Sequence, residues 1–234
     1  MTALSIVIPV FNERKLVGEA AEELCRKLDA LGWDYELILS ENGSTDGTLD
    51  VLKELQRRLP RMRFIHGDEP NYGRALKRGI LEAKGAQVVC DEIDLCDLDF
   101  YHRALPLLDA GADLVVGSKA MKGSDDARPL LRRVATRVIT LLLRAVTGFR
   151  GTDTHGLKAF KRDRLLPVAE ACVVERDLFA SEFVIRAQRM GRDVREIPIT
   201  LAERRPPSIQ LLRRVPRVLK GLLQLGWTIR IRHR

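Results

Sequence analysis

The feature that most constrains the fold of this chain is a regular alternation of short apolar runs with segments of helical periodicity. The apolar runs cover residues 4–10, 35–39, 62–65, 86–90 and 114–116. Apolar residues at helical spacing occupy residues 15–31, 46–59, 72–84 and 100–108 between them. Such alternation with short connections predicts an α/β fold, in which helices flank a mostly parallel central sheet.

A chain of 234 residues suits one sizeable domain. Helices over 130–146 and 177–190 and a strand over 194–199 are expected to complete it, so we assign residues 1–203 to the domain and 204–234 to a tail. The net charge is +8, but nine Arg or Lys and no acidic residue lie from Arg204 onward, which leaves −1 for the first 203 residues. The net positive charge therefore comes from the tail, and it bears on the binding partners of the tail rather than on the fold.

Three further observations concern the compartment. The four cysteines lack the spacing of a zinc site, and the N-terminus has no basic-then-apolar leader. No apolar run reaches the ~20 residues that span a bilayer. We therefore expect a cytoplasmic protein with reduced cysteines.

Polar residues follow four of the predicted strands, at residues 11–13, 41–44, 66–68 and 92–94. Ligands of parallel sheets bind beyond the carboxyl ends of the strands, so these stretches are expected to form one site. Glu92 and Asp94 alternate after a strand and could face one hard cation together. Taken alone, the acidic cluster of residues 91–97 would be read as a solvated turn; the other three stretches favour a site.

The usual nucleotide fingerprints are missing. No Gly-x-Gly-x-x-Gly follows the first strand, and no Gly-x-x-x-x-Gly-Lys-Ser/Thr occurs anywhere. These absences disfavour a dinucleotide dehydrogenase and a P-loop nucleotidase.

Four motifs in order resemble those of the family-2 inverting glycosyltransferases, which have the Rossmann-like GT-A fold. They are Val7-Ile8-Pro9-Val10-Phe11-Asn12-Glu13, Asn42-Gly43-Ser44-Thr45-Asp46-Gly47-Thr48, Asn71-Tyr72-Gly73-Arg74-Ala75 and Glu92-Ile93-Asp94. The last stands where the family has Asp-x-Asp, and Glu41 also stands where Asp is usual. Both departures keep the carboxylate and add a methylene.

The resemblance implies a nucleoside-diphosphate sugar as donor and Mg²⁺ or Mn²⁺ as cofactor. The implied nucleotide site consists of Pro9, Phe11, Glu13, Glu41, Gly73, Arg74 and Glu92. Glu92 and Asp94 would hold the cation, and Asp94 counts among the catalytic residues. Pro9 and Phe11 are explained equally well by packing at the end of a strand.

The stretch after Gly117-Ser118 resembles the polyprenyl-phosphate sugar transferases of the dolichyl-phosphate mannose synthase type. In those proteins a basic residue and an Arg-x-x-x-Ser pair bind the acceptor phosphate; Lys119, Arg132 and Thr136 take these positions here. Arg132 and Thr136 are four residues apart and share a helix face. The alternative is a basic helix face in water.

Asp153 and His155 lie in a segment that matches the same family only loosely. They are candidates for contact with the metal, His155 as a third ligand, or with the acceptor. An ionised phosphate acceptor needs no strong base, whereas a hydroxyl acceptor would require one, and these residues are then the first candidates. His155 could equally be a structural histidine.

The tail predicts a basic amphipathic C-terminal helix. Its arginines and lysine fall on one side and its leucines and valines on the other, with Trp227 near the end. This pattern is typical of a helix at a membrane surface, although a helix docked on the protein's own core is the alternative. Nucleic acid is disfavoured because the tail has no interleaved aromatic residues.

We therefore expect a metal-dependent inverting glycosyltransferase that uses a polyprenyl phosphate acceptor, peripheral on the cytoplasmic face of a membrane. Two alternatives stay open. One is a soluble transferase acting on a small or saccharide hydroxyl acceptor, and the other is a nucleotide-sugar-binding protein without turnover.

Overall fold

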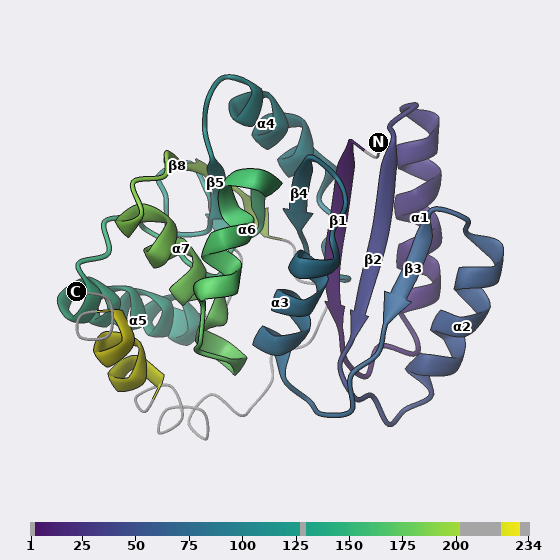
Figure 1. Cartoon of the computed structure of the whole chain (residues 1–234), viewed down its shortest axis with the longest axis horizontal. Coiled ribbons are helices and arrows are strands. Elements are labelled where there is room, and N and C mark those ends of the chain that lie inside the picture. Colours follow the sequence, from purple (N-terminus) through teal and green to yellow (C-terminus); the bar gives the residue numbers. More distant parts are fainter. Residues whose placement is uncertain (1–2, 127–129, 202–220, 230–234) are drawn as a thin grey trace.

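The computed structural model describes residues 3–126, 130–201 and 221–229, and its centre is a seven-stranded sheet (Figure 1). The strands are β1 (Leu4–Val10), β2 (Tyr35–Glu41), β3 (Met62–Ile65), β4 (Gln87–Cys90), β5 (Leu114–Ser118), β7 (Lys158–Lys161) and β8 (Val194–Pro198). Their order across the sheet is β3-β2-β1-β4-β7-β5-β8, and only β7 runs antiparallel to its neighbours. The predicted mostly parallel sheet is therefore confirmed. Two short strands, β6 (Asp125–Asp126) and β9 (Thr200–Leu201), pair separately.

Helices cover both faces of the sheet. They are α1 (Val17–Ala30), α2 (Thr48–Arg58), α3 (Tyr72–Glu82), α4 (Leu98–Asp109), α5 (Leu130–Thr147), α6 (Arg162–Ala171), the 3-10 turn η1 (Arg176–Leu178) and α7 (Phe179–Arg189). Ile6 and Ile8 of β1 pack with α1, α2 and α4, whereas Val7 packs with α3, α6 and α7 on the other side. Burial on both faces explains why the strands are continuous apolar runs.

Of the predicted tail, residues 204–234, the structure describes residues 221–229. Residues 202–220, which contain most of the predicted basic helix, lie outside the described residues. Residues 221–229 are helical, and Leu222, Leu225 and Ile229 are buried in the same core cluster as α7. This described segment packs on the domain's own core.

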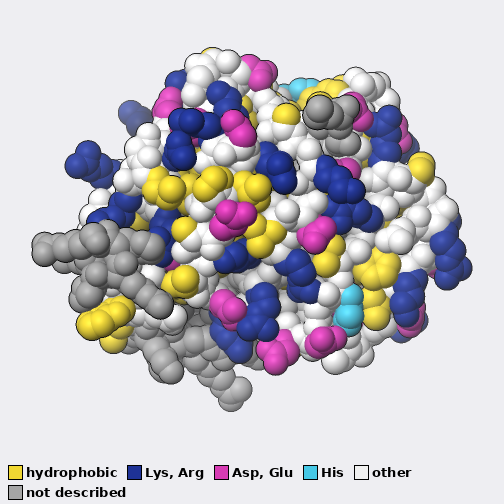
Figure 2. Space-filling view, in the orientation of Figure 1, with side chains coloured by type: hydrophobic (Ala, Val, Ile, Leu, Met, Phe, Trp, Pro, Cys, Tyr) yellow, Lys and Arg dark blue, Asp and Glu magenta, His cyan; other side chains and the backbone are white. Residues whose placement is uncertain are grey.

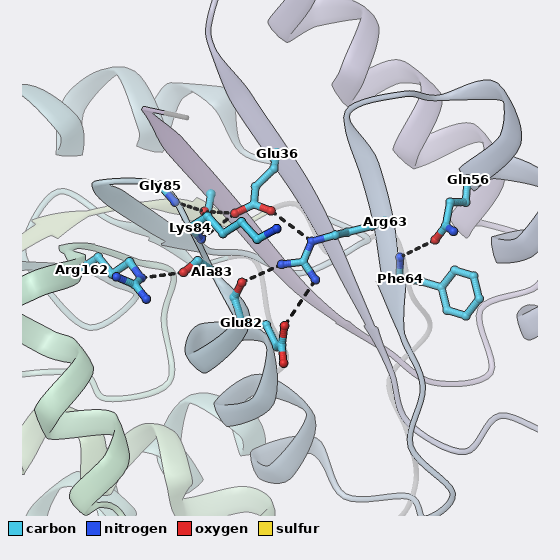
Figure 3. A network of polar contacts seen from close by, with 10 residues as sticks. Glu36, Gln56, Arg63, Phe64, Glu82, Ala83, Lys84, Gly85 and Arg162 are labelled. Atoms are coloured by element: carbon cyan, nitrogen blue, oxygen red, sulfur yellow. Dashed lines mark hydrogen bonds and ion pairs between the residues drawn. The ribbon is translucent and has the colours of Figure 1, made fainter. Parts of the chain in front are cut away.

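A polar network anchors the C-terminal end of α3 to the first strands (Figure 3). The Glu36 carboxylate accepts hydrogen bonds from Ser5 Oγ at 2.6 Å, Lys84 N at 2.7 Å and Arg63 Nε at 3.1 Å. Arg63 also donates to the Glu82 carbonyl at 2.6 Å. Burial alone would raise the pKa of Glu36, but these bonds hold the pKa below its usual value. Fixing this end of α3 orients its N-terminus toward the opposite edge, where the parallel strands end.

Within the described ranges, no helix is both long enough and apolar enough to cross a bilayer.

Candidate functional site

The turn after β1 is fastened to the turn after β2. Asn12 Oδ1 accepts from Thr45 N at 2.9 Å, and Asn12 N donates to Ser44 Oγ at 2.9 Å. Glu13 N donates to Thr48 Oγ1 at the start of α2, also at 2.9 Å. Asn12 has a φ of 53°, a left-handed conformation that asparagine tolerates better than most residues. The two loops therefore form one rigid double turn.

The expected nucleoside residues lie on or beside this double turn. Pro9 is half-buried near the end of β1, Phe11 is exposed, and Glu13 is half-buried at the entrance to α1. An exposed phenylalanine on a rigid turn offers a flat apolar surface to a ligand, and packing in the strand explains Pro9 better than Phe11.

Glu41 ends β2 and is fully buried. Its carboxylate accepts from Ser44 N at 2.5 Å and contacts His66 Nδ1 at 2.5 Å. Burial alone would raise the pKa of Glu41, but these partners hold the pKa below its usual value. The ionised Glu41 carboxylate therefore lies beneath the double turn, and its contact with the half-exposed His66 orients that imidazole ring. The contact with His66 joins the ends of β2 and β3, and no local sequence pattern predicts it.

Asn71 caps the N-terminus of α3, where Gly73 and Arg74 of the expected nucleotide site lie. Asn71 Oδ1 accepts from Arg74 N at 3.0 Å and from Arg176 N at 2.9 Å. The Arg74 guanidinium is engaged by both Glu175 oxygens, at 3.2 and 2.9 Å. A Cβ at Gly73 would lie 2.5 Å from Arg176 O, so this glycine permits close approach of the 3-10 turn. A phosphate at this helix N-terminus would compete with Glu175 for the Arg74 guanidinium.

The four acids after β4 separate into two roles. Asp91 is buried and accepts from Glu92 N at 2.6 Å, Asp97 N at 3.0 Å and Tyr101 Oη at 2.5 Å. Burial raises the pKa of Asp91 to about 7 despite these bonds. Asp97 caps α4 by accepting from Phe100 N. Asp91 and Asp97 therefore shape the loop that carries Glu92 and Asp94 between them.

Glu92 and Asp94 share the loop for a different reason than the predicted strand alternation. The strand ends at Cys90, and Leu95 N donates to Glu92 O at 2.9 Å, which closes a turn over residues 92–95. Two carboxylates on one turn suit Mg²⁺ or Mn²⁺, which proteins often hold through one or two carboxylates together with substrate phosphates. Among the described residues, no three His, Cys, Asp or Glu side chains are gathered as a ready metal site, so His155 is not preassembled with this pair.

Asp153 joins the segment before β7 to the end of β5. It accepts from Lys119 N at 3.2 Å and from His155 N at 2.8 Å, and it is fully buried. Burial alone would raise the pKa of Asp153, but the Lys119 charge and the His155 amide hold the pKa below its usual value. His155 is half-buried, with Nδ1 3.1 Å from Thr154 Oγ1. The predicted pair is thus close to the predicted acceptor residue Lys119.

A small polar hollow of about 120 Å³ lies between the end of β5 and the first turns of α5. Its lining consists of Lys119, Ala120, Met121, Ser124, Arg133, Thr136 and Arg137. The structure thus brings the predicted Lys119 and Thr136 together and adds two arginines that the sequence motif did not single out. The predicted Arg132 lies on α5, but its side chain is outside the described part of the chain.

Lys158 is a buried residue of this site that sequence reasoning missed. It lies on β7 opposite Cys90 of β4, and its ammonium donates to Gly156 O at 2.7 Å. Burial lowers the pKa of Lys158, while the nearby charges of Asp153 and Glu92 oppose that effect. Lys158 therefore lies within electrostatic reach of both Glu92 and Asp153.

Comparison with known proteins identifies the family. The model of the family "Glycosyl transferase family 2" matches residues 5–166. The glycosyltransferase AglD of Haloferax volcanii is 26% identical over 99% of this chain and 38% of its own length. An undecaprenyl-phosphate 4-deoxy-4-formamido-L-arabinose transferase of Edwardsiella ictaluri is 30% identical over 86% of this chain and 60% of its own length. A dolichyl-phosphate β-glucosyltransferase of Trichomonas vaginalis, ALG5A, is 25% identical over 84% and 64%.

This chain thus spans between 38% and 64% of the length of these curated relatives. Among solved structures, glucosyl-3-phosphoglycerate synthase of Mycobacterium tuberculosis, in complex with Mn²⁺, UDP-glucose and phosphoglyceric acid, matches with a TM-score of 0.66 at 19% identity. The match covers 96% of this chain and 79% of that chain and confirms the expected GT-A fold. Because the family model matches well over half of the residues, this chain belongs to glycosyl transferase family 2.

Proposed function

We propose that this protein transfers a sugar from a nucleoside-diphosphate sugar to a polyprenyl phosphate at the cytoplasmic face of a membrane. The observation that carries the proposal is the hollow lined by Lys119, Arg133, Thr136 and Arg137. Its three cationic side chains, together with the hydroxyls of Ser124 and Thr136, suit a phosphate group. Two of the curated relatives are named as transferases to undecaprenyl or dolichyl phosphate, which supports the same acceptor class.

The donor would bind at the carboxyl ends of β1, β2 and β4. Phe11 offers an apolar surface to the nucleoside, and Glu92 and Asp94 would hold Mg²⁺ or Mn²⁺ against the diphosphate. When bound, such a cation neutralises the charge that builds on the departing nucleoside diphosphate. A structural neighbour crystallised with Mn²⁺ and UDP-glucose supports this cofactor.

The reaction that fits this arrangement is a direct displacement. A phosphate oxygen of the acceptor forms a bond to the anomeric carbon, the bond to the diphosphate oxygen breaks, and its electron pair leaves with the diphosphate, so the configuration inverts. The low pKa of Asp153 makes this carboxylate a weak base. A weak base suits an acceptor that is already ionised and suits a hydroxyl acceptor poorly. Asp153 instead positions the Lys119 backbone beside the acceptor hollow.

The donor half is tested by thermal shift with UDP and GDP, with and without MnCl₂. We expect a manganese-dependent stabilisation that Glu92→Gln and Asp94→Asn each remove. Asp99→Asn, which alters an exposed acid on α4, is the matched control and should keep the shift. Equal shifts in all three variants and the wild type would remove the metal assignment.

The acceptor half is tested by transfer assays that use UDP-glucose or GDP-mannose with undecaprenyl phosphate. Lys119→Ala and Arg137→Ala should raise KM for the acceptor while the thermal shift with nucleotide and manganese stays unchanged. A shift without turnover on any acceptor would indicate a nucleotide-sugar-binding protein.

A second candidate acceptor is a small phosphorylated molecule. The structural neighbour complexed with phosphoglyceric acid motivates it, because the polar hollow here would also accept a small phosphate compound. Transfer to 3-phosphoglycerate but not to undecaprenyl phosphate would favour this candidate.

A further inference from the structure

Helix α5 carries a row of arginines along one outer edge. Arg133, Arg137 and Arg144 follow one another at helical spacing and are exposed. Arg144 also donates from both Nε and Nη2 to Gly151 O, at 3.2 and 2.8 Å, which fixes the last of the row. No acidic residue occurs between Leu130 and Thr147, so the helix itself offers these charges no partner.

An apolar row runs beside the arginines on the same helix. Its exposed members are Val134, Val138, Leu141 and Leu142. Their spacing of four, three and one places them on one stripe, and Leu141 is 61% exposed. The core-facing side of α5 is already buried through Leu143 and Ile139. Helix α5 therefore has a second apolar face that the described part of the fold leaves uncovered. Single exposed leucines are common on protein surfaces, whereas a contiguous apolar row of this kind marks an interaction surface.

The helix of residues 221–229 extends this surface. Leu223 is 75% exposed and Trp227 is 63% exposed, one turn apart. A Cβ on Gly226 would lie 2.5 Å from Val146 Cγ1, so this helix lies directly against the end of α5. Figure 2 shows one small group of hydrophobic side chains at the lower left, in the region where Figure 1 has the C-terminal helix and α5. We call Val134, Val138, Leu141, Leu142, Leu223 and Trp227 the apolar face.

We propose that the apolar face, with its arginine row, lies in the interface of an anionic lipid membrane. A basic edge beside an apolar stripe, with a tryptophan at its end, suits headgroups that are negative and acyl chains just beneath them. A second copy of the chain fits less well, because α5 carries no acid to meet a partner's arginines.

The apolar face and its arginine row lie beside the acceptor hollow. Arg133 and Arg137 belong both to the arginine row and to the lining of the hollow. A polyprenyl phosphate with its phosphate in the hollow would have Val134 and Val138 one residue away on the helix, beside the start of its hydrocarbon chain. The inference rests on the proposed function for the identity of this acceptor, but membrane contact does not depend on it.

The test is co-sedimentation of the full chain with phosphatidylcholine vesicles, with and without phosphatidylglycerol. We expect binding to the anionic vesicles, and we expect Leu141→Glu and Leu223→Glu each to weaken it by about fivefold or more, since a charge is moved into the interface. The control is Leu31→Glu, at a leucine that is 45% exposed at the end of α1 on the other helix layer. The control should bind vesicles as the wild type does.

The possible outcomes separate the two proposals. Transfer to farnesyl phosphate in solution that is unaffected by Leu141→Glu, together with lost vesicle binding, supports the interface. No binding of the wild type to anionic vesicles overturns it, whether or not sugar transfer is found. The proposed membrane interface is also overturned if light scattering finds a dimer that Leu141→Glu dissociates while vesicle binding is unchanged. The apolar face would then be a contact between two copies of the chain. Vesicle binding without any sugar transfer would leave the interface standing and remove the proposed function.

Discussion

At position 156 the backbone lies so close to β5 that no side chain has room. A Cβ on Gly156 would lie 1.6 Å from Gly117 O, and Gly117 N donates to Leu157 O at 2.8 Å in the same contact. We expect Gly156→Ala to force the two segments apart and to lower the free energy of unfolding by about 1–3 kcal/mol or more. Urea unfolding measures this loss.

The same displacement should move Asp153 away from Lys119 N, so acceptor KM should rise as well. The control is Gly18→Ala in α1, where the nearest atom to a new Cβ is Val51 Cγ1 at 3.7 Å. Alanine favours a helix over glycine by roughly 0.5–1 kcal/mol, so this variant should be neutral or more stable. If both variants were equally stable, the close contact at Gly156 would be refuted.

Single residues also mark where sequence reasoning about the site stops. The position of Glu92 and Asp94 after a buried strand follows from the apolar run before them. The structural roles of Asp91 and Asp97 do not follow from the sequence pattern. Asp91 is bound by a tyrosine ten residues away, and Asp97 caps the start of α4. The contact between Glu41 and His66 joins two loops 25 residues apart. Such contacts depend on the folded arrangement of neighbouring strands, which residue types alone do not specify.

Among elements, the predictable ones are those with a single clear periodicity. The first five strands were found because burial on both faces makes them continuous apolar runs. Strand β7 was missed because Lys158 and Lys161 interrupt its pattern, although Lys158 is buried. Helix α6 was missed as well; it contains Pro167 and shows little separation of polar and apolar sides. In both elements, packing against neighbours outweighs local pattern.

The anchoring of α3 gives a prediction at the scale of elements. Glu36 ties the end of this helix to the first strands through an ionised carboxylate (Figure 3). We expect Glu36→Gln to lower the free energy of unfolding by about 1.5–3 kcal/mol at pH 7, the range for hydrogen bonds to a charged group.

The pH dependence of this loss follows from the depressed pKa. The contribution is complete above the unfolded-state value of 4.5 and is lost as the pH falls through the lower folded-state pKa. The difference between wild type and Glu36→Gln in urea unfolding should therefore shrink below pH 4.5. Glu54→Gln, at an exposed acid on α2, is the control and should change little. A difference that is the same at pH 7 and pH 3.5 would contradict an ionised anchor.

At the scale of the whole molecule, the helix of residues 221–229 can unfold either together with the domain or separately from it. Leu225 is fully buried in the cluster that contains α7, whereas Leu223 of the same helix points into solvent. If the helix is part of one cooperative unit, Leu225→Ala should lower the free energy of unfolding of the entire chain by about 2–5 kcal/mol, the range for a buried leucine. Leu223→Ala should stay within about 0.5 kcal/mol of the wild type, as exposed positions do.

Urea unfolding followed by far-ultraviolet circular dichroism measures both variants on the full chain. A single transition with an unchanged slope in Leu225→Ala would place residues 221–229 in the same unit as the central sheet. An early separate transition, or no loss at all, would show that this helix unfolds independently. The pair also bears on membrane contact, because Leu223→Ala should weaken vesicle binding without loss of stability. A helix that is fixed to the core through Leu225 can then present Leu223 and Trp227 to a lipid surface in a defined orientation.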